Sequence, residues 1–120
     1  MSDVAANETR DLISSDKVEG TAVYNPDGDK LGSIDDLVID KQSGQIRYAV
    51  LEVGGFLGMG ADRYPLPWDM LEYDTTHDGY VVALDKAKLE DAPRYADADV
   101  PAYTADYARR VNSYYGVGWF

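Results

Sequence analysis

The sequence predicts an all-β fold: a small antiparallel, partly open β-barrel of about six strands, followed by a C-terminal α-helical extension. Two observations predict it. Between Val18 and Leu84, short runs rich in β-branched and aromatic residues alternate with turn residues, as in antiparallel β proteins. After Pro93 the apolar residues recur at helical spacing. We therefore divide the 120 residues into a flexible N-terminal arm (1–17), a barrel domain (18–92) and a tyrosine-rich C-terminal extension with a helix (93–120).

The first half of the domain predicts three strands, at residues 21–24, 31–40 and 45–53. Residues 25–28 and 41–44 separate them as turns, because Pro presets φ and Gly accepts positive φ. Strict alternation in the second strand puts Leu37 and Ile39 on one face and Val38 on the other. The third strand carries apolar residues on both faces, which predicts a central strand covered on both sides.

The second half of the domain predicts strands at residues 63–66, 70–73 and 80–84. Pro65 and Pro67 cannot donate ladder hydrogen bonds, so we expect this part at a sheet edge or corner. Residues 85–91 predict a helical turn ended by Pro93, and residues 92–101 an acidic, irregular linker.

The C-terminal extension predicts one amphipathic helix. Thr104 is a suitable N-cap, the helix should run to about residue 115, and Gly116 is a suitable stop. One face of this helix carries four apolar or aromatic side chains: Tyr103, Tyr107, Val111 and Tyr114.

Composition narrows the classes of function. Eleven Lys and Arg against 22 Asp and Glu leave a formal net charge of −11, which disfavours direct binding to nucleic acid or to anionic lipid. No apolar run approaches the length of a transmembrane helix, and residues 1–10 lack the apolar core of a signal peptide. Cytoplasmic localisation is therefore expected. Without cysteine, the chain has no disulfides, thiolate metal sites or cysteine nucleophiles.

No cofactor or metal site is predicted. Asn25, Asp27, Asp29 and Asp36 match positions 1, 3, 5 and 12 of a calcium-binding loop, but Lys30 stands where glycine is needed. Both flanks of this segment are also strand-like, whereas an EF-hand needs helices. A solvated hairpin explains the acidic residues without an ion.

The glycine-rich loop at residues 54–60 resembles a phosphate-binding loop only superficially. Ala61 and Asp62 follow its last glycine, where a P-loop needs Lys and then Ser or Thr. Phe56, Leu57 and Met59 project from this loop. They either fold back onto the barrel or remain exposed and contact a protein partner.

The sequence gives equally little support for catalytic residues. His77 is the only histidine and lies in a predicted turn, with no partners nominated for a triad or a metal site. Asp69 and Glu72 fall on opposite faces of a strand-like segment. The sequence therefore predicts a protein that is not an enzyme.

Aromatic residues are concentrated at the C-terminus. Seven of the 14 lie in the last 28 residues: Tyr95, Tyr103, Tyr107, Tyr114, Tyr115, Trp119 and Phe120. Tyr and Trp are favoured where a surface is buried against a partner. The extension either packs on its own barrel or on a second subunit, and a swapped tail would satisfy both. Our candidate partner contacts are Phe56, Leu57, Met59, Tyr103, Tyr107, Tyr114 and Trp119.

Several segments together resemble the PRC-barrel domain family. The resemblance spans roughly residues 12–92, and the segments that carry it are Val18-Glu19-Gly20-Thr21-Ala22-Val23-Tyr24-Asn25, Gly28 with Leu31-Gly32, Ile34-Asp35-Asp36, Ile39-Asp40, Gly44 with Tyr48-Ala49-Val50, Gly54-Gly55-Phe56-Leu57-Gly58, and Pro65-Leu66-Pro67-Trp68. It implies a small β-barrel that acts through protein contacts and has no catalytic motif.

The family includes the cytoplasmic domain of the photosynthetic reaction-centre H subunit, the C-terminal domain of a ribosome maturation factor, and many stand-alone bacterial proteins. We expect neither a transmembrane helix nor a second barrel, which makes the chain most similar to the stand-alone members. We expect a non-enzymatic interaction or assembly module that forms a homo-oligomer, a dimer being the simplest. The alternative is an accessory factor linked to ribosomes or RNA processing, which would act through a basic protein partner.

Overall fold

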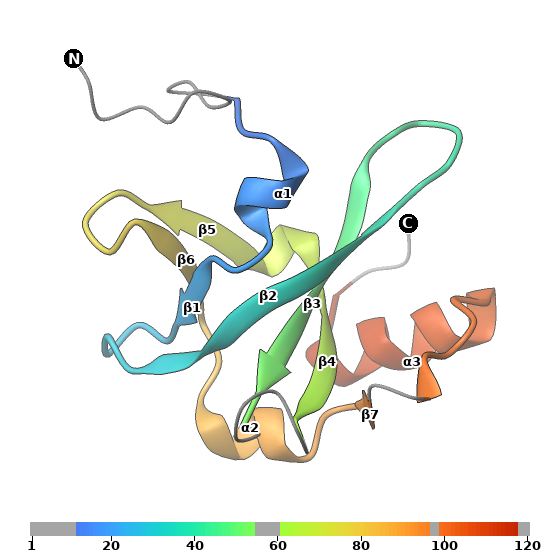
Figure 1. Ribbon diagram of the computed structural model, residues 1–120. Helices are drawn as coiled ribbons and strands as arrows, with labels where there is room; N and C mark the ends of the chain where they lie inside the picture. Colours follow the sequence, from blue (N-terminus) through green and yellow to red (C-terminus); the bar gives the residue numbers. More distant parts are fainter. Residues whose placement is uncertain (1–11, 55–60, 97–98, 118–120) are drawn as a thin grey trace.

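A single curved sheet forms most of the molecule in the computed structural model, which describes residues 12–54, 61–96 and 99–117 (Figure 1). Its strands are β1 (Ala22–Tyr24), β2 (Lys30–Ile39), β3 (Ile46–Val53), β4 (Asp62–Pro67), β5 (Leu71–Asp74), β6 (Gly79–Val82) and β7 (Tyr95–Ala96). The helices are α1 (Ser15–Val18), α2 (Lys86–Glu90) and α3 (Ala105–Tyr115), and a 3-10 turn, η1 (Trp68–Met70), joins β4 to β5. The strand order is β5-β6-β1-β2-β3-β4-β7.

The sheet is mixed, so the prediction of an antiparallel barrel was wrong in that respect. Strands β1 to β4 form an antiparallel meander, but β6 pairs with β1 in parallel, Val23 opposite Tyr80. The reason is that η1 carries the chain across to the far side of the sheet, and the β5–β6 hairpin then places β6 beside β1. Gly79 allows this approach, because a Cβ there would lie 2.6 Å from the carbonyl oxygen of Ala22.

The sheet is also open. Its terminal strands, β5 and β7, do not pair with each other, which agrees with the partly open fold expected. The described residues form seven strands where about six were expected, because β7 lies within the segment predicted to be an irregular linker. Only two residues of β7 pair, with Asp62 and Arg63 of β4.

Strand β3 lies inside the sheet, between β2 and β4, as predicted. Its four central residues, Tyr48 to Leu51, are all buried: Ala49 and Leu51 belong to the core, and Tyr48 contacts α3 on the other face. Among the described residues, no strand pairs with the outer edge of β4 beyond Arg63, so Pro65 and Pro67, which lack a backbone N–H, interrupt no ladder at that edge.

The core lies inside the curve of the sheet and under α1 and α2. Its most deeply buried side chains come from β1, β2, β3, β4 and β6: Val23, Ile34, Leu51, Leu66 and Val82. Leu89 of α2 and Val18 of α1 complete it. The domain boundaries themselves stay a prediction, although α1 overlaps the end of the arm assigned to residues 1–17.

Helix α3 has the limits that its capping residues predict. The Thr104 side chain accepts a hydrogen bond from the amide of Tyr107 at 3.1 Å. Gly116 ends the helix in the left-handed conformation, φ 71°, and its amide bonds back to the last turn. In the described part of the chain, none of the helices has the length and apolar character needed to cross a bilayer.

Candidate interaction surface

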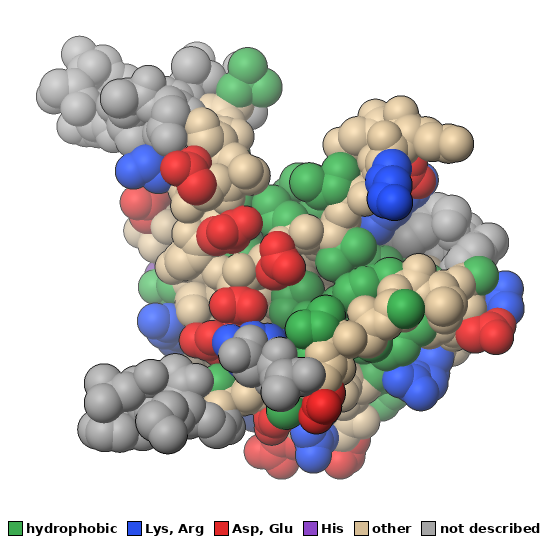
Figure 2. Space-filling model, turned by 45° about the vertical axis from the view of Figure 1, so that its right-hand side comes forward, with side chains coloured by type: hydrophobic (Ala, Val, Ile, Leu, Met, Phe, Trp, Pro, Cys, Tyr) green, Lys and Arg blue, Asp and Glu red, His purple; other side chains and the backbone are tan. Residues whose placement is uncertain are grey.

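A groove of about 420 Å³ lies between the β2–β3 hairpin and the N-terminal half of α3. We call it the hairpin groove. It is lined by Val38, Ile39, Asp40, Lys41, Arg47, Tyr48, Tyr103, Thr104, Ala105 and Ala108. On the face drawn in Figure 2, hydrophobic side chains gather across the middle, with charged side chains of both signs around them.

The end of β2 forms the apolar wall of the groove, next to a β-bulge in the β2–β3 hairpin. Val38 pairs with Tyr48, but the register shifts between Val38 and Ile39, so that Ile39 pairs with Ile46. The extra residue at this shift is Arg47 of β3, and such a bulge bends the hairpin locally. Val38 and Ile39 both line the groove beside it. Ile39, the last residue of β2, stays 48% exposed.

The other wall is α3, which is fixed to its own sheet. The Tyr48 hydroxyl donates to Asn112 Oδ1 at 2.9 Å and lies 3.4 Å from the carbonyl oxygen of Ala108. The Tyr48 and Tyr103 rings have centroids 6.0 Å apart. Burial raises the pKa of the Tyr48 hydroxyl. The extension thus packs on the barrel of the same chain, one of the two arrangements left open by the sequence.

Charged residues of both signs surround the groove. Arg47 and Asp40 form an ion pair at 3.6 Å, and Lys41 is exposed beside them. Backbone amides of Ser43 and Gln42 donate to the Asp40 carboxylate, which lowers the pKa of Asp40. The groove lining thus carries two cations and one anion, whereas the chain as a whole has a net charge of −11.

Of the candidate contacts predicted from sequence, Tyr103 lines the groove. Tyr107 packs edge-on against Tyr103, with centroids 5.3 Å apart, and lies under the guanidinium of Arg110. The Tyr114 hydroxyl donates to the carbonyl of Lys88 in α2, so this ring braces two helices. The remaining candidates, Phe56, Leu57, Met59 and Trp119, lie outside the described residues.

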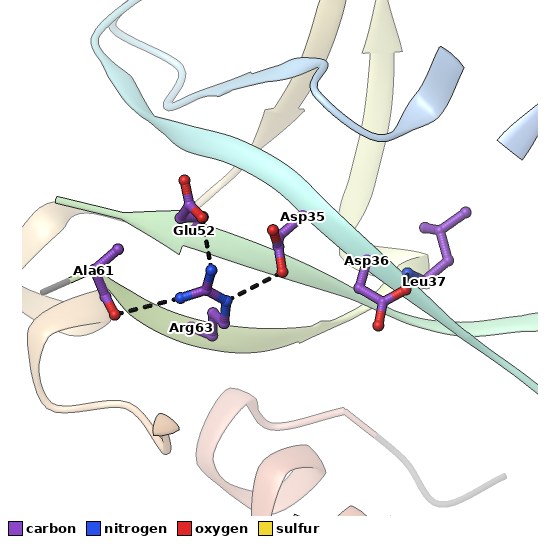
Figure 3. A network of polar contacts seen from close by, with 6 residues as sticks. All are labelled: Asp35, Asp36, Leu37, Glu52, Ala61 and Arg63. Carbon is purple, nitrogen blue, oxygen red and sulfur yellow. Dashed lines mark hydrogen bonds and ion pairs between the residues drawn. The ribbon is translucent and has the colours of Figure 1, made fainter. Parts of the chain in front are cut away.

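A cluster of polar contacts centred on Arg63, away from the groove, holds the sheet together. Arg63 of β4 is only 7% exposed and ties three strands together (Figure 3). Its Nε donates to Asp35 Oδ2 at 3.1 Å and its Nη2 to Glu52 Oε2 at 2.9 Å, while Nη1 lies 3.4 Å from the carbonyl oxygen of Ala61. A buried guanidinium needs such carboxylate partners. No feature of the sequence singled out Arg63, because its partners are 11 and 28 residues away.

Asn25 and His77 make hydrogen bonds within turns. Asn25 Oδ1 accepts from the amides of Asp27 and Asp29, which closes the β1–β2 turn. His77 Nδ1 lies 2.9 Å from Asp74 Oδ2 in an exposed turn. This contact and the amide of Thr76 lower the pKa of Asp74. Within residues 12–54, 61–96 and 99–117, no three His, Asp or Glu side chains are placed to share a metal ion.

Comparison with known proteins agrees with this architecture. The PRC-barrel domain model matches residues 10–89. The chain is also 28% identical over 93 residues to an uncharacterized protein of Deinococcus radiodurans, an alignment that covers 77% of this chain and 33% of that protein. The chain thus spans about a third of the length of this relative. Because the family model covers two thirds of the sequence, the chain belongs to the PRC-barrel domain family.

Proposed function

We propose that this chain is a non-enzymatic protein-interaction module that self-associates, with the hairpin groove as its contact surface. PRC-barrel domains mediate protein contacts. The observation that carries the proposal is the groove itself, which combines apolar walls with the half-exposed Ile39. Interfaces bury such side chains at their centre and leave charged residues at the rim.

The polar groups described above favour this function over catalysis. A reactive site needs convergent titratable groups in a concave, water-excluding pocket. Here His77 and Asp74 lie on an exposed turn, and Arg63 is occupied by Asp35 and Glu52. The hairpin groove offers hydrophobic contact and a charged rim, which suit a protein surface.

Sedimentation equilibrium of the full chain over a wide concentration range tests the proposal. We expect the apparent mass to rise from that of one 13.3 kDa chain towards that of two. A mass of one chain at every concentration would rule out self-association.

The net charge of −11 supports a second candidate, an accessory factor linked to ribosomes or RNA processing. Such an acidic surface repels RNA and attracts a basic protein. Co-sedimentation with ribosomal particles, reversed by high salt, would support this role. A chain that stays in the supernatant at low salt would exclude it.

A further inference from the structure

We propose that two copies meet about a two-fold axis beside Ile39, with the β2–β3 hairpin of each lying on the N-terminal turn of the other's α3. This inference rests on the self-association proposed above and specifies its geometry. Three observations carry it: the projecting hairpin, the apolar groove at its base, and the charges around that groove.

The hairpin extends beyond its neighbours in the sheet (Figure 1). Strand β1 pairs with β2 only as far as Ser33, and β4 ends opposite Tyr48. In the described part of the chain, residues 37–40 and 45–47 therefore have no further strand beside the hairpin. A projecting element next to a groove on the same face suits reciprocal exchange, because a two-fold contact uses the same surface twice.

The apolar part of the groove would be the centre of the contact. Val38 and Ile39 come from the hairpin, and Ala105 and Ala108 from α3. The two alanines are small, so a side chain of the partner can approach the helix backbone closely. Ile39 is the exposed apolar residue nearest the hairpin tip, and a position beside the axis would bury it in both copies.

The charged residues around the hairpin groove favour a second copy of this chain as the molecule that binds there. Two chains of net charge −11 repel each other, so they can associate only where the local charge is not acidic. At this groove Lys41 and Arg47 outnumber Asp40, while Asp106 lies in the first turn of α3. A two-fold arrangement brings the cations of one hairpin near Asp106 of the other copy, and the pairing occurs twice.

The same charges argue against a basic partner in this groove. Lys41 and Arg47 would repel it, and like-charge contacts across an interface are unfavourable. A basic protein would bind elsewhere on the acidic surface.

Cysteine cross-linking tests the position of the axis, since the chain has no cysteine of its own. A disulfide requires Cβ atoms about 4 Å apart, so it reports on residues close to the axis. We expect Ile39→Cys to form a covalent dimer on mild oxidation. The matched control is Val100→Cys, at a residue that is 64% exposed and does not line the groove. Equal rates for the two variants would overturn the inference.

Charge-reversal substitutions test the proposed ion pair between Lys41 of one copy and Asp106 of the other. Lys41→Glu and Asp106→Lys should each weaken the dimer by about two- to thirtyfold, because each substitution alters both exposed ion pairs of the two-fold contact. The double variant, which reverses the pair, should recover the wild-type dissociation constant. Because Asp106 also pairs with Arg109, circular dichroism must show that α3 is retained. Additive weakening in the double variant would overturn the pairing.

The outcomes separate this inference from the proposed function. If the wild-type chain remains monomeric at every concentration, self-association and this geometry fail together. If it dimerises but Ile39→Cys cross-links no faster than Val100→Cys, only the geometry fails.

Discussion

Tyr48→Phe is predicted to loosen α3 from the sheet. The substitution keeps the ring and removes the hydroxyl that donates to Asn112 Oδ1 at 2.9 Å. Asn112 is only 2% exposed, so water has little access to the oxygen left without its donor. A hydrogen bond contributes about 0.5–1.5 kcal/mol net, and stranding its buried partner raises the total to about 1–3 kcal/mol.

Urea unfolding followed by circular dichroism measures this cost. We expect the free energy of unfolding to fall by about 1–3 kcal/mol with an unchanged m-value. The matched control is Tyr73→Phe, which removes a hydroxyl that donates to Asp78 from a ring that is 46% exposed. This control should lower the free energy of unfolding by less than about 0.5 kcal/mol.

A double-mutant cycle makes the test specific to this pair. Asn112→Leu replaces the amide by an apolar side chain of similar shape, and with Tyr48→Phe it removes both polar partners together. The double variant should therefore cost less than the sum of the single variants, by about 0.5–1.5 kcal/mol. Strict additivity, or Tyr48→Phe at wild-type stability, would refute the attachment of α3 through this bond.

Three further predictions concern the sheet and the buried tyrosines. Arg63→Met should destabilise the chain by about 2–4 kcal/mol in urea unfolding, because it leaves two carboxylates without their cation; Arg109→Met, at an exposed ion pair, should cost under about 0.5 kcal/mol. Gly32→Ala should lower the melting temperature more than Gly116→Ala. A Cβ added at Gly32 would lie 2.3 Å from the carbonyl oxygen of Glu52. At Gly116 a Cβ meets no neighbour, so alanine costs only the strain of the positive φ, about 1–2 kcal/mol. Burial raises the pKa of Tyr115 above its unfolded value of about 10, so the folded chain retains this proton where the unfolded chain loses it. Stability should thus fall as the pH rises past about 10, which unfolding curves at increasing pH would show; an unchanged midpoint at pH 11 would contradict it.

Local chemistry explains what the sequence predicted well. A capping hydroxyl and a glycine that accepts positive φ define helix α3, and both act within a few residues of the helix ends. Apolar residues on both faces of β3 likewise predicted its central, doubly covered position, which the structure confirms. These features depend on neighbouring residues and are visible before the fold is known.

Features that depend on distant partners were missed. The parallel pairing of β1 with β6 joins residues more than 50 positions apart and follows from the path through η1. The bulge at Arg47 depends on the register between β2 and β3, so neither strand's own sequence reveals it. Strand β7 is only two residues long, too short for a periodic signal.

The candidate surface was predicted in part. Tyr103 does line the hairpin groove, but Tyr107 and Tyr114 lie against other parts of the same chain. An aromatic stripe on a helix fits intramolecular packing and partner binding equally well, so sequence could not separate them. Ile39, which lines the groove and stays 48% exposed, was not among the contacts predicted from sequence.

Sedimentation equilibrium of the wild-type chain beside Ile39→Asp and Val100→Asp tests the central proposal most directly. Self-association through the hairpin groove predicts the mass of two 13.3 kDa chains for the wild type and for Val100→Asp. It predicts the mass of a single chain for Ile39→Asp, which places a charge at the centre of the contact. A wild type that stays monomeric, or an Ile39→Asp variant that still dimerises with unchanged affinity, would contradict it.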